Sequence, residues 1–348
     1  MTDKKELIKN MPKVDLHCHL DGSLRTETIL DLARRQNYKL PADNVEDLRK
    51  FVRVPPWCRS LGEFLERFEV FYPLLKNAYA LERSAYELCR DSAAENIKYL
   101  EVRFAPVLQK TDNFPIPEVI KAVLRGLKRG SKEFTIKTGI ILCLYRGTPL
   151  EISLETVKWA KKLKNEGIAG VDVAGDESTY SLKKFEKPIH KCKKAGIPVT
   201  VHAGEAAGPD SIRAALDYGA NRIGHGVALQ DDKKLLKEVA RKQIPLEICI
   251  TSNVHTQVVK SYSAHPFRNF ISTGVKVTLN TDDRGVSGID LTHEYNKAYE
   301  LGIKEDQLFS LALNGIEAAF LNSSEKENLE QNFRKEFTEL RGKDNEEK

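Results

Sequence analysis

Histidine and carboxylate side chains, the groups best suited to metal binding and proton transfer, gather at the ends of apolar stretches of this sequence. His17 and His19 lie in the apolar stretch Val14 to Leu20. Side chains at i and i+2 of a strand point to the same side, so these two imidazoles can share one cation. His202 ends a later apolar stretch, and Glu205 follows it after a turn of small residues. Three converging imidazoles are typical of a zinc site.

Two further apolar stretches end in polar groups. His225 lies between Gly224 and Gly226, and these glycines let the backbone come close to a bound ligand. Asp282 and Asp283 end the last apolar stretch. Adjacent carboxylates repel each other and are costly to bury without partners, so a cation or a hydrogen-bonding ligand is expected there. Because neighbouring side chains diverge, one carboxylate can reach a metal while the other reaches a substrate.

Short apolar or β-branched stretches recur with helical spacing between them, which is typical of βα units and a parallel sheet. The eight expected strands are Val14 to Leu20, Tyr99 to Pro106, Lys137 to Tyr145, Gly170 to Gly175, Ile197 to Glu205, Arg222 to Gly226, Pro245 to Asn253 and Val275 to Asp283. Eight such units predict one α/β domain, a TIM (β/α)8 barrel, whose catalytic groups lie at the C-terminal strand ends. The histidines and carboxylates above end strands one, five, six and eight, so they are expected to meet at one mouth.

The expected fourth strand bears on the number of metal ions. Two-metal sites on this architecture usually use a bridging carboxylated lysine on that strand, and residues 170–175 contain no lysine. One metal ion is therefore favoured. A donor set of imidazole and carboxylate makes zinc the expected ion.

The segments outside the repeat are predicted to be helical. Helices are expected over Leu154 to Asn165 and Asp210 to Tyr218. Residues 21–97 form a long insertion whose aromatic residues are spaced three to four apart, which predicts an extra helical layer, a lid over the mouth, or both. Residues 323–348 are predicted to form a closing helix with a frayed end after about Arg341.

Composition narrows the class of protein. The 348 residues are 41% hydrophobic and 30% charged, which suits a packed core. The 55 basic and 50 acidic residues are interspersed, so no nucleic-acid partner is expected. Neither a signal peptide nor a run of ~20 apolar residues is recognisable, so we expect a cytoplasmic protein without membrane contact. The six cysteines form no C-x-x-C pair and are expected to be buried thiols. Nothing in the sequence indicates an oligomeric state.

The chain resembles the adenosine deaminases and their adenosine deaminase-like relatives. The resemblance extends over nearly the whole chain, from residues 12–22 to residues 280–283, and includes residues 171–177, 202–205, 222–226 and 251–253. It implies one zinc ion per chain, with a water molecule completing its shell. The implied zinc ligands are His17, His19, His202 and Asp282.

The resemblance also implies roles in deamination. Glu205 would pass a proton to purine N1, which makes C6 electrophilic, and His225 would orient the zinc-activated hydroxide and stabilise the alkoxide at C6. Asp283 would contact N7, the backbone N–H of Gly175 would contact N3, and Asp21 would hold the ribose together with the lid. His19 would border the bound substrate, and the metal ligand Asp282 would also belong to the catalytic group. The products would be inosine and ammonia.

The implied substrate is a purine nucleoside, adenosine or deoxyadenosine, in purine salvage. The adenine-using branch typically carries glutamate where this chain has Asp21. Two departures leave the 5′ substituent open: Arg284 replaces the usual proline, and Val54 to Leu61 is unlike the lid of the animal enzymes. Arg284 is expected either to meet an anionic group of a modified nucleoside or to face solvent. The alternative substrates are 6-aminodeoxyfutalosine, methylthioadenosine and adenine.

Three other functions compete with this one. The cytidine and nucleic-acid deaminases carry H-x-E and P-C-x-x-C motifs, and neither occurs here. A metal-dependent hydrolase of esters or amides would use the same activated water. A nucleoside-binding barrel without catalysis is disfavoured, because Glu205 and His225 have no obvious purpose in binding alone.

Overall fold

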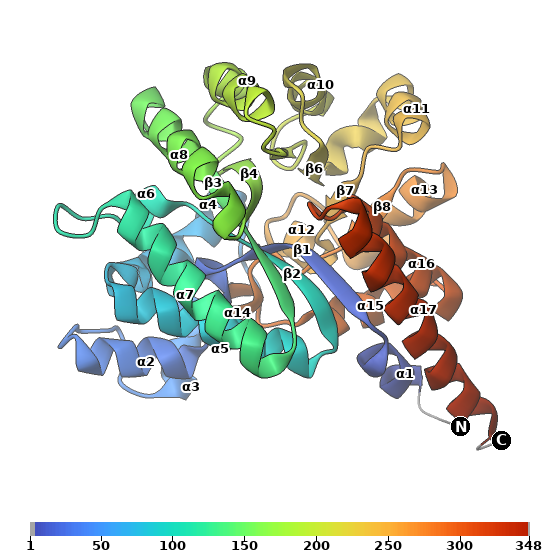
Figure 1. The fold of residues 1–348 in the computed structure, drawn as a ribbon, viewed down its shortest axis with the longest axis horizontal. Coiled ribbons are helices and arrows are strands. Elements are labelled where there is room, and N and C mark those ends of the chain that lie inside the picture. Colours follow the sequence, from blue (N-terminus) through green and yellow to red (C-terminus); the bar gives the residue numbers. More distant parts are fainter. Residues whose placement is uncertain (1–3, 347–348) are drawn as a thin grey trace.

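Parallel strands at the centre of the molecule are surrounded by helices (Figure 1). The computed structural model describes residues 4–346, with the backbone alone for residues 343–346. Within this range the strands are β1 (Lys13–His19), β2 (Ile97–Phe104), β3 (Lys137–Tyr145), β4 (Ile168–Ala174), β5 (Thr200–Ala203), β6 (Arg222–His225), β7 (Leu246–Ile248) and β8 (Val277–Leu279). Every pairing between neighbouring strands is parallel, and the predicted α/β barrel is confirmed.

The barrel consists of two four-stranded halves, β1-β2-β3-β4 and β5-β6-β7-β8. Between β4 and β5, the Val171 N–H donates to the Pro198 carbonyl at 3.0 Å. Between β8 and β1, the Asp282 N–H donates to the His17 carbonyl at 2.7 Å, and the His19 N–H donates to the Asp282 carbonyl at 2.8 Å. These bonds close the sheet, so the C-terminal ends of all the strands meet on one side.

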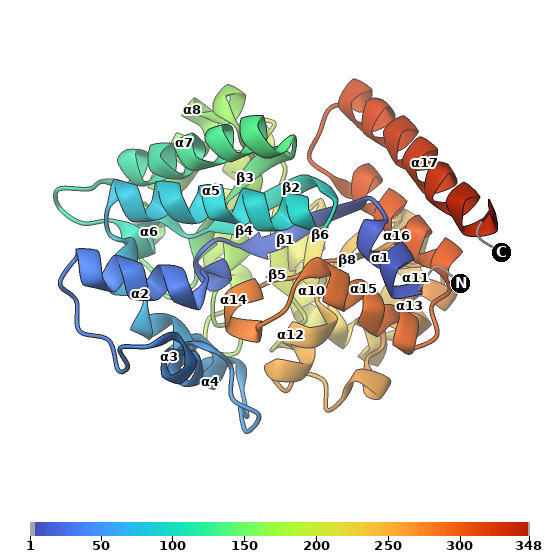
Figure 2. The same ribbon diagram turned by 90° about the horizontal axis from the view of Figure 1, so that it is seen from below.

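Helices cover the outside of the barrel (Figures 1 and 2). The α-helices are α1 (Lys4–Asn10), α2 (Thr26–Arg35), α3 (Val45–Val52), α4 (Leu61–Leu65), α5 (Ala78–Ala94), α6 (Pro106–Gln109), α7 (Ile116–Phe134), α8 (Leu150–Lys162), α9 (Glu186–Lys194), α10 (Pro209–Tyr218), α11 (Lys233–Lys242), α12 (Ile250–His255), α13 (Phe267–Ser272), α14 (Arg284–Ser287), α15 (Leu291–Glu300), α16 (Glu305–Ala318) and α17 (Ser323–Glu346). The 3₁₀ turns are η1 (Asp21–Ser23), η2 (Glu66–Val70), η3 (Tyr72–Leu75), η4 (Lys164–Glu166), η5 (Leu182–Phe185), η6 (Val227–Asp231) and η7 (Tyr262–Ala264).

Local sequence determines where α10, the helix that follows the strand carrying His202, begins and ends. Pro209 occupies the start of α10, where a missing N–H costs nothing. Gly219 ends α10 with φ +103°, a left-handed conformation that favours glycine. These two residues fix the length of α10, and the turn between β5 and α10 therefore stays short.

The insertion between β1 and β2 is helical, and it contributes both core and cavity lining. Phe64, Phe68 and Phe71 are buried, and the rings of Phe68 and Phe71 lie 5.4 Å apart. Leu61, at the start of α4, lines the cavity at the barrel mouth together with Phe64 and Phe68. In Figure 2, α2, α3 and α4 lie beside the barrel at the opposite end from α17.

The predicted bounds of the last two strands extend beyond the strands that the structure contains. β7 ends at Ile248, and Thr251 to Asn253 belong to α12. β8 ends at Leu279, and Asp282 and Asp283 lie in the connection to α14. Asp282 has φ +61°, which a regular strand cannot contain, so the strand must stop before it.

Helix boundaries also differ at two places. The expected helix Leu154 to Asn165 is α8, which begins at Leu150 and ends at Lys162. The closing helix continues past Arg341, where a frayed end was expected. Arg341 forms an ion pair with Asp306 of α16 at 2.6 Å, a contact that holds this turn against the molecule.

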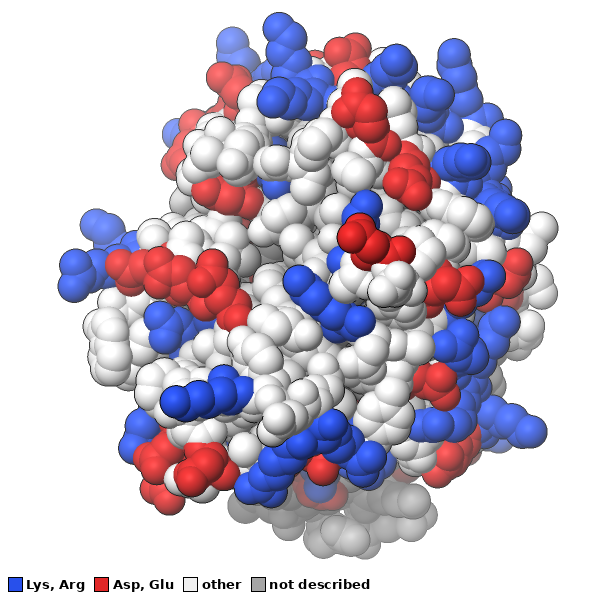
Figure 3. Space-filling view, turned by 90° about the vertical axis from the view of Figure 1, so that its left-hand side faces the viewer, with Lys and Arg blue, Asp and Glu red and all other residues white. Residues whose placement is uncertain are grey.

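Apolar side chains from the strands and the inner helix faces form one continuous core. All six cysteines are buried and free, as predicted. Figure 3 shows lysine and arginine mixed with aspartate and glutamate over the face that it presents. Within the described residues, no helix has both the length and the apolar character needed to cross a membrane.

Candidate metal centre and active site

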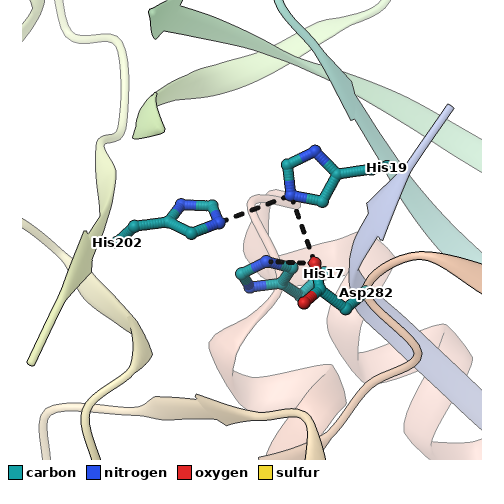
Figure 4. A group of neighbouring side chains, drawn as sticks. All are labelled: His17, His19, His202 and Asp282. Carbon is teal, nitrogen blue, oxygen red and sulfur yellow. Dashed lines mark hydrogen bonds and ion pairs between the residues drawn. The ribbon is translucent and has the colours of Figure 1, made fainter. Parts of the chain in front are cut away.

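Four side chains that the sequence singled out converge at the barrel mouth (Figure 4). His17 and His19 come from β1, His202 comes from β5, and Asp282 follows β8. Asp282 Oδ1 lies 3.3 Å from His17 Nε2 and 3.3 Å from His19 Nε2. His19 Nε2 lies 3.4 Å from His202 Nε2. Donor atoms of all four side chains lie within 4.8 Å of one another.

Two imidazoles of this group are oriented by carboxylates behind them. His17 Nδ1 lies 2.8 Å from Glu247 Oε2, and His202 Nδ1 lies 2.9 Å from Asp172 Oδ2. For His17 the hydrogen bond with Glu247 keeps the ring hydrogen on Nδ1 and leaves a lone pair on Nε2, facing the other donors. For His202 the negative charge of Asp172 near Nδ1 favours the same tautomer, although the two groups are not aligned for a hydrogen bond. The two rings are therefore prepared to bind a cation.

The donor group fits a metal ion by geometry and by chemistry. His17 Nε2 is buried and has no hydrogen-bond partner, although a buried polar atom usually has one. Ligand atoms of a tetrahedral zinc with bonds of about 2.0–2.1 Å lie about 3.3–3.4 Å apart, which matches the measured spacings. Three nitrogens and one carboxylate oxygen are also a donor set that zinc accepts.

A buried arginine holds the two orienting carboxylates in place. Arg103 Nη1 lies 2.9 Å from Asp172 Oδ2, and its Nη2 lies 2.8 Å from Glu247 Oε2. Glu247 Oε1 also contacts Arg222 Nε at 2.5 Å and accepts a bond from Thr200 Oγ1 at 2.9 Å. A network of buried charges thus connects β2, β4, β6 and β7 beneath the candidate metal ligands.

Replacing Arg103 with methionine is expected to lower the free energy of unfolding by about 3–5 kcal/mol, because the change leaves buried carboxylates short of a partner. Chemical denaturation of the metal-free protein measures this effect. The matched control is Arg125→Met, since Arg125 is half exposed and pairs with Glu82 on the surface. Such a pair contributes about 0–1 kcal/mol, so equal losses in the two variants would contradict the role of Arg103.

The loop that carries Glu205 is held by one carboxylate. Glu177 accepts backbone N–H groups from four consecutive residues of the loop, 204–207, at 2.8–3.1 Å. It also accepts a bond from the Ser211 hydroxyl. Because both oxygens of Glu177 are occupied, the Glu205 backbone has little freedom to move.

Glu205 and His225 lie beside the metal-ligand group. Burial raises the pKa of Glu205 to about 8, so this carboxyl group holds its proton at neutral pH. Burial also lowers the pKa of His225 well below its usual value, so the imidazole is neutral. His225 Nε2 lies 3.6 Å from Glu205 Oε2 and 3.9 Å from Asp282 Oδ2. The mouth therefore holds a proton donor and a neutral imidazole next to the donor group.

The remaining predicted site residues line the same cavity, which has about 570 Å³ of empty space. Asp21, Gly175 and Asp283 are among its lining residues. Burial raises the pKa of Asp21 to about 6. The pKa of Asp283 is raised well above its usual value by burial and by the negative charges of Asp282 and Asp21 nearby. Oδ1 of each of these two aspartates is buried without a partner. The cavity thus presents unsatisfied polar atoms to a ligand.

Both expectations for Arg284 are wrong. Its side chain is 8% exposed and forms an ion pair with Glu95, just past the end of α5. The other oxygen of Glu95 accepts the Thr292 N–H at 2.9 Å. The chain turns into α14 directly after Asp283, which directs Arg284 to this pair and not to the cavity, whose lining does not include it.

Sequence reasoning missed Asp172, Glu247, Arg103 and Glu177. The first three interrupt apolar strands, and a charge flanked by apolar residues within a strand is a signal of a buried, paired group. Glu177 lies in a loop and carries no such signal. Its role depends on the position of the β5 loop, which only the fold determines.

A parallel barrel with this donor group at its C-terminal strand ends belongs to the class of metal-dependent hydrolases. Residues 12–336 match the sequence family described as adenosine deaminase. An adenosine deaminase from Clostridium botulinum (strain Okra) is 40% identical over 334 residues, which cover 95% of this chain and 99% of that protein. The chain therefore belongs to the adenosine deaminase family, as the resemblance implied.

Solved structures agree with this assignment. The apo structure of the N6-methyl-AMP deaminase from Arabidopsis thaliana has a TM-score of 0.84 and 30% identity, covering 95% of this chain and 98% of that one. The Arabidopsis protein ADAL, complexed with IMP, has a TM-score of 0.87 and 29% identity, covering 96% of this chain and 99% of that one. One of these neighbours is thus named as a deaminase of an N6-methylated purine nucleotide, and the other holds a purine nucleotide.

Proposed function

We propose that this protein is a cytoplasmic enzyme of purine salvage that hydrolyses adenosine and deoxyadenosine to inosine and deoxyinosine, with release of ammonia. The observation that carries the proposal is the buried carboxyl group of Glu205, whose pKa burial raises to about 8, beside a group of three imidazoles and a carboxylate. The relative from Clostridium botulinum, 40% identical over nearly its full length, bears the same name as this activity. One water molecule is consumed for each amino group released.

We also propose that His17, His19, His202 and Asp282 hold a single zinc ion. When bound, zinc supplies Lewis-acid activation of a water molecule at neutral pH. The hydrogen bond from Ser252 Oγ to Asp282 Oδ2, 2.6 Å long, supports this role because it leaves Oδ1 for the cation.

The residues of the chain then act on the purine. Glu205 donates its proton to N1, which increases the positive character of C6. His225 donates from Nε2 to the oxygen that attacks C6 and stabilises the negative charge that develops on this oxygen. The amino nitrogen gains the hydrogen of the new hydroxyl group at C6, the C6–N bond breaks and ammonia leaves. Glu205 regains its proton from solvent.

The activity is expected to fall as pH rises through about 8. The protonated form of Glu205 is the active form, and burial raises its pKa to about 8. Above this pH the fraction of protein with a protonated Glu205 falls steadily, and the rate falls with it. The pH profile of kcat/KM for adenosine measures this effect. A rate that stays constant from pH 7 to pH 10 would contradict the assignment.

The cavity lining supports a substrate without a charged 5′ group. We propose that Asp283, whose pKa is raised well above its usual value, donates a hydrogen bond to N7, that the Gly175 N–H contacts N3, and that Asp21 holds the ribose. Among the described residues, the lining contains no lysine and no arginine, which a 5′-phosphate would require for charge pairing. We further propose that α4 and η2, whose side chains Leu61, Phe64 and Phe68 border the cavity, act as a lid over the bound nucleoside.

A substrate panel tests the proposal. Zinc-loaded protein is given adenosine, deoxyadenosine, adenine, methylthioadenosine or 6-aminodeoxyfutalosine, and ammonia is measured in each case. The two nucleosides are expected to give the highest kcat/KM, with the spectral change from adenosine to inosine. A preference for adenine would exclude a role of the ribose, and a preference for one of the other two would assign a different 5′ group. If none of the five compounds releases ammonia, the proposal is wrong, and the remaining functions are a nucleoside-binding barrel and a hydrolase of esters or amides.

A further inference from the structure

The imidazole of His225 makes a hydrogen bond on the side that faces away from the cavity. His225 Nδ1 lies 3.0 Å from Asn253 Nδ2, and Asn253 Oδ1 lies 3.1 Å from His265 Nε2. The Phe267 N–H donates to His265 Nδ1 at 3.2 Å. His225, Asn253 and His265 are all buried, with at most 4% of any of them exposed. A chain of polar groups thus connects the site to the start of α13.

The direction of every hydrogen in this chain follows from the backbone N–H of Phe267, which can only donate. His265 Nδ1 must therefore carry a lone pair. Burial lowers the pKa of His265 to about 3, so this ring is neutral and its single hydrogen lies on Nε2. That hydrogen requires an acceptor, which fixes Oδ1 of Asn253 toward His265. The amide N–H of Asn253 then donates to His225 Nδ1.

We propose that His265 is a positioning residue that acts through Asn253 to hold His225 in the tautomer with its hydrogen on Nε2. This inference deepens the proposed function and rests on it, because the Nε2–H is the group assigned to the attacking oxygen. Nε2 faces Glu205 Oε2 at 3.6 Å and Asp282 Oδ2 at 3.9 Å. The hydrogen is therefore directed into the reacting region.

The tautomer also divides the histidines by role. His17 and His202 have carboxylates at Nδ1, so each offers an Nε2 lone pair to a cation. His225 has a hydrogen-bond donor at Nδ1, so its Nε2 carries the hydrogen and offers no lone pair. His225, Cys249 and Asp282 also lie close enough to share a metal ion, but the tautomer leaves that group without its nitrogen ligand. The imidazole remains a donor to substrate oxygen.

Nuclear magnetic resonance of the zinc-loaded full-length protein, labelled with ¹⁵N at histidine, measures the tautomer. The His225 signals are assigned by their loss in a His225→Gln variant. Wild-type His225 is expected to carry its hydrogen on Nε2. In His265→Leu the Asn253 amide can reverse, so we expect a mixture of tautomers and a fall in kcat of about 10- to 100-fold. The matched control is His255→Gln in α12, which lies outside the chain of hydrogen bonds and is expected to change neither quantity.

A second variant tests the same relay from its centre. Asp at position 253 can only accept, so Asn253→Asp is expected to place a hydrogen on His225 Nδ1 and to lower kcat by up to about 10⁴-fold, as a wrong tautomer does in hydrolases. His265→Gln, which keeps a donor, should recover part of the activity lost in His265→Leu. The proposal would be overturned if His225 of the wild-type protein carried its hydrogen on Nδ1. It would also be overturned if the tautomer of His225 stayed unchanged in both His265→Leu and Asn253→Asp. Because the spectra need no turnover, they remain decisive even if adenosine is not the substrate.

Discussion

Glu205→Gln is expected to lower kcat for adenosine by about 10²- to 10⁴-fold, with little change in fold or metal content. Glutamine has nearly the same shape as glutamic acid but carries no transferable proton. The surrounding loop should keep its position, because Glu177 binds the backbone of residues 204–207 and not the Glu205 side chain. The loss should therefore report proton transfer alone.

Ammonia release and elemental analysis of the same preparation measure the two quantities. The fall in rate above pH of about 8 should also disappear in this variant, since the titrating group is gone. Asp210→Asn, an exposed change in the first turn of α10, is the matched control and should retain both the rate and the pH profile. An unchanged rate in Glu205→Gln would remove Glu205 from the proton transfer.

His202→Ala is expected to abolish stoichiometric metal binding and, with it, the activity. The side chain supplies one of three imidazoles in the group, and its Nε2 lies 3.4 Å from that of His19. A Lewis acid stabilises the transition state by several kcal/mol. At 1.36 kcal/mol for each factor of ten, its loss should lower kcat/KM by about 10³-fold or more.

The control for this variant is His190→Ala, which removes an exposed imidazole on α9 and should change neither metal content nor rate. A chelator should also inactivate the wild-type protein, and added zinc should restore it. Retention of one metal ion per chain together with turnover in His202→Ala would show that the ligand set is different.

The convergence of the candidate site residues could be predicted because each stands in a short motif at the end of an apolar stretch. Two histidines at i and i+2 identify His17 and His19 without reference to any other part of the chain. The barrel rule then brings His202, His225 and Asp282 to the same side, although they are far apart in sequence. The strand count and the order of elements follow from the same periodicity.

The partners of these residues could not be predicted in the same way. Glu247 contacts His17 and Arg103 contacts Glu247 across large distances in sequence, and only the closed sheet brings them together. Arg284 was expected to meet an anionic group of a modified nucleoside or to face solvent, yet its ion pair is with Glu95 at the far end of a long insertion. A motif identifies a side chain, whereas its neighbours depend on tertiary packing.

The ligand group joins the first and last strands of the barrel, with His17 in β1 and Asp282 directly after β8. The pocket is therefore complete only when the segment after β8 has paired with β1 and closed the sheet. A metal ion that binds the finished protein favours the folded form by mass action. Metal supply would then govern the lifetime of this enzyme in the cell as well as its rate.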